Sequence, residues 1–150
     1  MDGQMVDEVD LRLIESLRAD SRQSVNDLAA VANVSRATAY QRLARLREAG
    51  VIRRFTIDVD PHKVGLPIAA LVLVGVVQHA WRGVGERLRM LPGVEWLALS
   101  TGSFDYVLLV RAPDIAHLRD VVLEGLQNIA EIQSTQTMLL LDEPEVGPPS

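Results

Sequence analysis

The spacing of apolar residues changes once along this chain, and the change limits the folds open to it. Up to Gly50 the apolar residues recur at helical spacing, whereas after Val51 they alternate with polar residues or run together as in strands. A helical first part and a mixed second part predict an α+β chain with two regions. Its 150 residues suffice for one domain or for two small ones.

The first fifty residues predict three helices. Each helix begins at an oxygen-bearing side chain that can accept a free backbone amide, and these capping residues are Asp7 or Asp10, Ser24 and Ser35. Asp27 lies three residues after Ser24 and forms a capping-box variant. The sequence "ANV" separates the second helix from the third, which ends near Gly50. A short helix, a tight turn and a longer helix predict a helix-turn-helix.

Positive charge is concentrated on and around the third predicted helix. The chain has a formal net charge of -5, yet residues 21–55 hold seven arginines and only two acids. A helical projection places Ala39, Leu43 and Leu46 on one apolar stripe that faces the first two helices. A basic segment between acidic flanks indicates a local anionic partner, and a merely solvated helix face is the alternative.

The rest of this helix has the side chains that a DNA major groove accepts. Arginines and hydroxyls bind phosphates, while arginine and glutamine pair with base edges. Double-stranded DNA is therefore the predicted partner. The predicted contact residues are Ser35, Arg36, Ala37, Thr38, Tyr40, Gln41, Arg42, Arg45, Arg53 and Arg54.

The segment after Gly50 leads into a second region. "VIRRFTIDVD" alternates as a strand does, so a wing strand is predicted there, with Arg53 and Arg54 at its start. The Pro and Gly content of "DPHKVGLP" marks a linker. The predicted organisation is a DNA-binding domain with a wing strand over 1–60, a linker over 61–67, a second domain over 68–143 and a flexible tail over 144–150.

Strands and helices follow one another in the second region. The predicted strands are 68–77, 94–100, 106–111 and 132–141, and the predicted helices are 83–91 and the stretch that Asp114 caps. This βαββαβ order predicts a ferredoxin-like domain of the RAM/ACT-like type, with an antiparallel sheet and both helices on one face.

The second face of that sheet is predicted to be apolar. The residues assigned to it are Leu71, Leu73, Leu97, Leu99, Leu108 and Val110. So many apolar side chains are rare on a solvated face, and a second subunit is the simplest cover. A homodimer is therefore predicted.

Several other classes of protein are disfavoured. The chain has no cysteine, which excludes disulfides and thiolate metal sites and fits the cytoplasm. The N-terminus is acidic, unlike a signal peptide, and the apolar run 68–77 is too short to span a membrane. His62, His79 and His117 are too widely spaced for a metal-site pattern. No catalytic residue, metal or cofactor is predicted.

Taken together, the two regions resemble the Lrp/AsnC regulators, also called feast/famine regulatory proteins. The first region matches through "VDEVDLRLIESLRADSRQSVNDLAAVANVSRATAYQRLARLREAGVIRRFTIDVDPHKVG", and the second through "LPGVEWLALSTGSFDYVLLV" and "IAEIQSTQTMLLL". The resemblance implies a transcriptional regulator that binds operators as a dimer. It also implies that dimers form through the sheet, assemble further, commonly into octamers, and bind an amino acid between dimers.

The resemblance also implies an effector-binding site. Its residues are Thr101, Gly102, Ser103 and Asp105 in a turn, and Ser134, Thr135, Gln136 and Thr137 on the last strand. Gly102 permits a positive φ and leaves amides free for a carboxylate, while Asp105 can accept an ammonium group. A plain hairpin turn is the alternative for these two residues.

The chain departs from the family pattern at two places. A second Pro-Gly-Val is replaced by Ala130, Glu131 and Ile132, and Arg36 stands where a small residue or proline is common. Two other functions stay open: a subunit similar to siroheme decarboxylase, which needs clustered His and Arg for a polyanionic tetrapyrrole, and an architectural DNA-binding protein without an effector.

Overall fold

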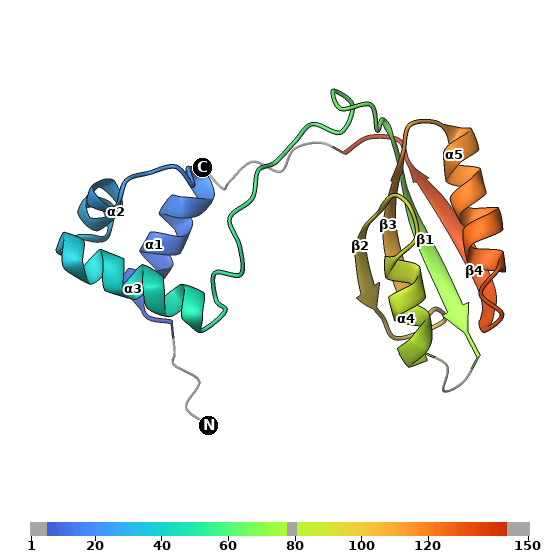
Figure 1. Cartoon of the computed structure of the whole chain (residues 1–150), viewed down its shortest axis with the longest axis horizontal. Coiled ribbons are helices and arrows are strands. Elements are labelled where there is room, and N and C mark those ends of the chain that lie inside the picture. Colours follow the sequence, from blue (N-terminus) through green and yellow to red (C-terminus); the bar gives the residue numbers. More distant parts are fainter. Residues whose placement is uncertain (1–5, 78–80, 144–150) are drawn as a thin grey trace. The chain divides into compact units, whose positions relative to one another are not determined.

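The chain forms two separate units, shown in Figure 1. The computed structural model describes residues 6–77 and 81–143. The N-terminal unit ends at Asp58 and the C-terminal unit starts at Val59. The predicted flexible tail, 144–150, lies outside the described residues. Within the described parts of the chain, no helix is long and apolar enough to cross a membrane.

All three predicted helices of the N-terminal unit are confirmed. They are α1 (Glu8–Ala19), α2 (Val25–Ala32) and α3 (Arg36–Glu48). Their N-caps are Asp7, Ser24 and Ser35, and the first two belong to capping boxes. Asn33, with a left-handed φ of 55°, makes the turn between α2 and α3. These helices share a core of Leu13, Leu28, Ala29, Ala32 and Ala39.

The predicted wing strand over residues 51–60 is wrong, because residues 53–60 have no regular secondary structure. A strand needs a neighbour for its backbone amides and carbonyls, and the described strands of the sheet all belong to the C-terminal unit. The segment follows α3 instead. The Ile52 amide donates to the Leu46 carbonyl at 3.0 Å, and the Arg47 guanidinium lies 5.9 Å from the centre of the Phe55 ring.

The C-terminal unit has the predicted βαββαβ order and antiparallel sheet. Its elements are β1 (Ile68–Val76), α4 (Trp81–Arg89), β2 (Val94–Leu99), β3 (Tyr106–Ala112), α5 (Ile115–Asp120), the π-helical turn η1 (Val121–Leu126) and β4 (Ile132–Leu140). The strand order is β2-β3-β1-β4, with every neighbouring pair antiparallel. The predicted linker forms a turn in which the Leu66 amide donates to the Pro61 carbonyl at 2.8 Å.

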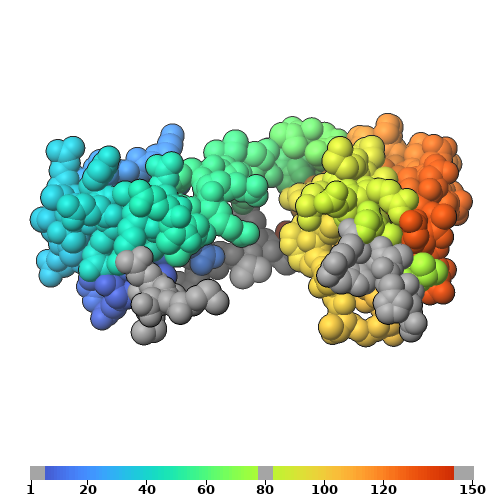
Figure 2. Space-filling view, turned by 60° about the horizontal axis from the view of Figure 1, so that its bottom comes forward, coloured from blue at the N-terminus to red at the C-terminus, as the bar shows by residue number. Residues whose placement is uncertain are grey.

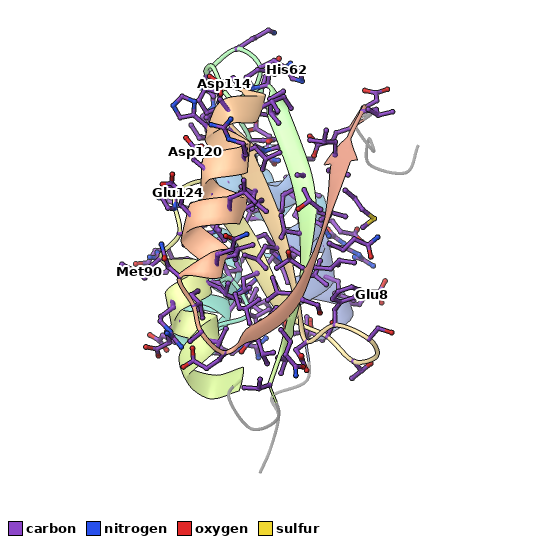
Figure 3. The ribbon with its side chains drawn as sticks, turned by 90° about the vertical axis from the view of Figure 1, so that its right-hand side faces the viewer. Glu8, His62, Met90, Asp114, Asp120 and Glu124 are labelled. Carbon is purple, nitrogen blue, oxygen red and sulfur yellow. The ribbon has the colours of Figure 1, made fainter. Side chains whose placement is uncertain are left out.

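Both helices cover the same face of the sheet, as Figure 3 shows from the side. Val72 and Val74 of β1 are buried there together with Val84 and Leu88 of α4 and Leu126 of η1. In the same view Asp114, Asp120 and Glu124 lie on the side of the helix away from the sheet. The helix-covered face therefore supplies the core of this unit.

Four of the six residues assigned to the second sheet face lie on the helix-covered face. Leu108 is opposite Val72 in the register, and both side chains are 1% exposed in the core. Val110, Leu97 and Leu99 occupy the same side, because they pair with Ala70, Leu108 and Tyr106 respectively. The sequence "YVLLVRA" is apolar at both odd and even positions, so its alternation does not identify the side that the helices cover.

The face away from the helices is nevertheless apolar, and we call it the open face. Leu71 and Leu73 were assigned to it correctly. The register adds further residues, and the half-buried or exposed apolar side chains of this face include Leu71, Leu73, Trp96, Ala98, Val107, Leu109, Met138 and Leu140. These side chains are half-buried or exposed in the single chain, and Trp96 is 51% exposed. A continuous apolar sheet face of this kind normally packs against another surface.

The register makes a prediction that adjacent residues of β3 can test. Leu108→Asp places a charge in the core and should lower the free energy of unfolding by several kcal/mol, enough to unfold the C-terminal unit. Leu109→Asp places the same charge on the open face and should leave the unit folded. Circular dichroism with thermal unfolding measures both. Equal loss of structure in the two variants would contradict the register.

Candidate DNA-binding and effector sites

The beginning of α3 presents polar side chains to solvent. The Thr38 amide donates to Ser35 Oγ at 3.1 Å, and the two hydroxyls are 2.8 Å apart. The exposed residues of the same part of the helix are Arg36, Ala37, Tyr40 and Gln41, and Tyr40 is 67% exposed. Figure 2 shows the cyan atoms of α3 on the outer surface of the N-terminal unit. The structure thus brings six of the predicted DNA-contacting residues together on one exposed helix surface.

Arg42 and Arg45, two other predicted contact residues, are bound by the N-cap of α1 and by an acid in its first turn. Arg42 Nη1 lies 2.6 Å from Asp7 Oδ2 and 3.0 Å from Asp10 Oδ1, and Arg45 Nη2 donates to Asp10 Oδ2. We call Asp7, Asp10, Arg42 and Arg45 the four-charge cluster. It joins one turn of α1 to one turn of α3.

Burial makes this cluster unusual. The Asp10 side chain is 0% exposed, whereas those of Arg42 and Arg45 are 26% and 35% exposed. The hydrogen bond from Arg42, and then the one from the Asp10 amide, lower the pKa of Asp7 to about 2. The same carboxylates raise the pKa of Arg42. The buried Asp10 carboxylate is tolerated because two guanidinium groups lie against it.

The cluster changes the interpretation of Arg42 and Arg45. Arg45 was predicted to contact DNA, but its side chain turns toward α1 because Asp10 binds it. The sequence itself contains a signal that a cationic side chain turns toward α1. Asp10 precedes Leu13, Ile14 and Leu17 at helical spacing, so it lies on the apolar stripe of α1. A carboxylate at such a position needs a buried cationic partner.

Arg53 and Arg54 are exposed in the segment that follows α3. The bond from Ile52 to Leu46 and the contact between Arg47 and Phe55 hold this segment beside the end of the helix. The two arginines therefore extend the basic surface of α3 without a wing strand.

The predicted effector turn joins β2 to β3, and Asp105 has a structural role there. Its Oδ2 accepts the Val76 amide at 2.8 Å, and its own amide donates to the Val74 carbonyl at 2.9 Å. Ser100 Oγ closes the turn by donating to the Phe104 carbonyl at 2.8 Å. Gly102 has a φ of +113°, as its position in the turn predicted. The turn is thereby fastened to the end of β1.

Gly75 brings the two predicted effector segments together. A Cβ at this position would lie 2.5 Å from Ser134 Oγ and 3.8 Å from the Ser103 carbonyl oxygen. Ser134 is opposite Gly75 in the register, whereas Gln136 and Thr137 pair with Leu73 and Val72 farther along β1. The turn and Ser134 therefore share one end of the sheet, and the later residues of β4 lie progressively away from it. Sequence reasoning missed Gly75.

Ser134 and Gln136 lie on the open-face side of β4, and Thr135 and Thr137 on the other side. Ser134 and Thr135 also border a hollow of about 310 Å³ between η1 and the start of β4. Thr101 is exposed in the turn.

The structure describes two of the three histidines, and they belong to different elements. His117 contacts Asp114 at 2.8 Å at the start of α5, and His62 lies in the turn before β1. His79 is outside the described residues. Among the residues that the structure describes, no three histidine, aspartate or glutamate side chains gather as metal ligands.

Comparison with known families favours one of the functions that the sequence left open. The family description "Lrp/AsnC ligand binding domain" matches residues 69–149, and "Winged helix-turn-helix DNA-binding" matches residues 6–53. The chain belongs to the Lrp/AsnC family. The family assignment confirms the resemblance seen in the sequence, and the transcriptional regulator is the function that it supports.

Relatives in this family are named as regulators. AldR of Mycobacterium tuberculosis, an HTH-type transcriptional regulator, is 35% identical over 140 residues, which cover 91% of this chain and 78% of AldR. An HTH-type transcriptional regulator of Pyrococcus furiosus is 32% identical over 136 residues, covering 91% and 92%. The alternative of an enzyme similar to siroheme decarboxylase is therefore not favoured.

Solved structures share the whole fold. AsnC of E. coli superposes with a TM-score of 0.87 at 26% identity and covers 96% of this chain and 97% of its own. A Neisseria meningitidis transcriptional regulator in complex with L-Met gives a TM-score of 0.85 at 23% identity, covering 94% and 93%, and at that identity it supports the fold alone.

The four-charge cluster predicts that Arg45 stabilises the fold, whereas the sequence predicted that it contacts DNA. Arg45→Ala removes one of two partners of a fully buried carboxylate and should lower the free energy of unfolding by about 1–3 kcal/mol. The exposed Arg36→Ala should change it by less than about 0.5 kcal/mol. Urea unfolding measures both, and equal stability of the two variants would show that Asp10 does not depend on Arg45.

Proposed function

We propose that this chain regulates transcription in the cytoplasm by binding operator DNA through α3 and the segment that follows it. The observation that carries the proposal is the exposed surface of Arg36, Tyr40 and Gln41 on the second helix of a helix-turn-helix. Arg36 supplies charge for phosphate, Gln41 supplies paired hydrogen-bonding groups for a base edge, and Ala37 permits close approach. Arg53 and Arg54 add backbone contacts beyond the helix.

The proposed assembly is a homodimer that pairs through the open face. That face has apolar residues at alternate positions of neighbouring strands, including Leu71 and Leu109. A second copy offers the same surface, as a two-fold interface requires. Light scattering on Leu109→Asp tests this assembly, because the charge should separate the subunits of a folded protein. Higher assembly, such as an octamer, is proposed from the family alone.

The proposed effector is an amino acid bound where the turn, Gly75 and Ser134 meet. Backbone amides near Gly102 offer donors for its carboxylate, and the Asp105 carboxylate offers a negative charge for its ammonium group. The Neisseria regulator of the same fold forms a complex with L-Met, and the proposal extends this chemical class of ligand to the present chain. In this proposal the hydroxyls of Thr101 and Ser103 complete the contacts from the turn, and those of Thr135 and Thr137 contribute from another subunit.

The proposed DNA surface predicts a loss of affinity without a loss of stability. Gln41→Ala removes a base contact and should weaken binding to an operator fragment by about 1–3 kcal/mol. Arg119→Gln serves as the control, since it is an exposed arginine on α5 of the other unit. Fluorescence anisotropy at fixed salt gives both dissociation constants. Unchanged affinity of the Gln41→Ala variant would remove Gln41 from the recognition surface.

The proposed effector site predicts different behaviour for two variants of Asp105. Asp105→Asn keeps an oxygen that can accept the Val76 amide but loses the charge, so the protein should fold and lose its thermal shift with amino acids. Asp105→Ala should in addition lower the melting temperature, because the bond to Val76 is lost. A thermal-shift screen with the twenty amino acids measures these effects. A full ligand shift in folded Asp105→Asn would show that the carboxylate has only the structural role.

A further inference from the structure

The four-charge cluster has a consequence for DNA recognition beyond its effect on stability. Resting on the proposed function of α3, we infer that Asp10 is a positioning residue that keeps Arg42 and Arg45 away from DNA phosphates. It thereby limits sequence-independent binding and raises the specificity of the recognition helix.

The hydrogen bonds of Asp10 explain how it holds both arginines. Oδ1 accepts Arg42 Nη1 at 3.0 Å, while Oδ2 accepts Arg45 Nη2 and the Asp7 amide, the latter at 3.1 Å. Asp7 binds Arg42 as well, at 2.6 Å. Both oxygens of the buried carboxylate are therefore used, and Arg42 bridges two acids. Two positive and two negative charges balance within the cluster.

A phosphate competes poorly for these guanidinium groups. To reach DNA fully, Arg45 would have to leave Asp10, whose side chain is 0% exposed, with one less cation beside it. Removing a partner from a buried charge is strongly unfavourable. Arg36, Arg53 and Arg54 are exposed, so their movement toward phosphate carries no comparable penalty. The three exposed arginines thus supply the phosphate contacts, and the two bound ones brace the helix.

This arrangement separates two functions of positive charge on one helix. Phosphate contacts strengthen binding to any DNA sequence, whereas base contacts distinguish one sequence from another. Releasing Arg42 and Arg45 would add two long cationic side chains to the DNA-facing helix. The affinity for every duplex would rise, and the preference for the operator would fall.

The dependence of binding on salt counts phosphate contacts directly. The test uses the full chain, a duplex that the wild-type protein selects from a random-sequence library, and a scrambled duplex of the same composition. For Asp10→Asn the slope of log affinity against log salt on the scrambled duplex should steepen by about 1 to 2, since each added phosphate contact contributes roughly 0.9. The dissociation constant for the scrambled duplex, divided by that for the selected duplex, should fall, because specificity decreases.

The matched control is Glu15→Gln, which changes the net charge equally at an exposed position of the same helix. Its slope should stay within about 0.5 of the wild-type value, since no phosphate contact is added. Equal slopes for Asp10→Asn and Glu15→Gln, both folded by circular dichroism, would overturn the inference.

Arginine variants test the same point without changing Asp10. Arg45→Gln should keep the wild-type slope, because Arg45 makes no phosphate contact, while Arg36→Gln should make it shallower by about 0.9. This pair decides the question if Asp10→Asn does not fold, since Arg42 and the Asp7 amide still bind Asp10 in Arg45→Gln. An equal loss of slope in both variants would overturn the inference. If the wild type selects no duplex, or Arg36→Gln has no effect, the proposed DNA surface fails instead.

Discussion

The buried carboxylate of Asp10 is the interaction on which the N-terminal unit depends. A charge without access to water needs partners of opposite sign, and here both come from one turn of α3. The pairing joins the first helix to the recognition helix across a core made only of small and medium apolar residues. Both this contact and the apolar core therefore hold α3 against α1.

The C-terminal unit separates its tasks along strand β1. One side of this strand packs against the helices, the other side contributes to the open face, and its end at Gly75 meets the turn and Ser134. A ligand at that end would touch the strand whose middle lies in the proposed subunit interface. By linkage, such a ligand changes assembly or DNA affinity only as far as it prefers one state over another.

Much of the fold was predictable because its signals are local. Asp7, Ser24 and Ser35 cap helices through atoms three residues away, so short windows of sequence contain both partners. The order of strands and helices follows from periodicity in the same way. The prediction of a wing strand was wrong because the alternation in "VIRRFTIDVD" shows only that the segment is able to pair. Pairing also needs a neighbouring strand, which a short window of sequence does not contain.

The sequence by itself determined the helix-turn-helix, the βαββαβ order and the family. Only the tertiary structure decided which side of β3 is buried, because "YVLLVRA" is apolar on both sides. Leu108 pairs with Val72 of β1, and both side chains are buried against the helices. It also decided that Arg45 turns inward and that Gly75 joins the effector segments. These outcomes depend on partners that are far apart in the sequence, 35 residues in the case of Asp10 and Arg45, and a short window of sequence does not contain both partners.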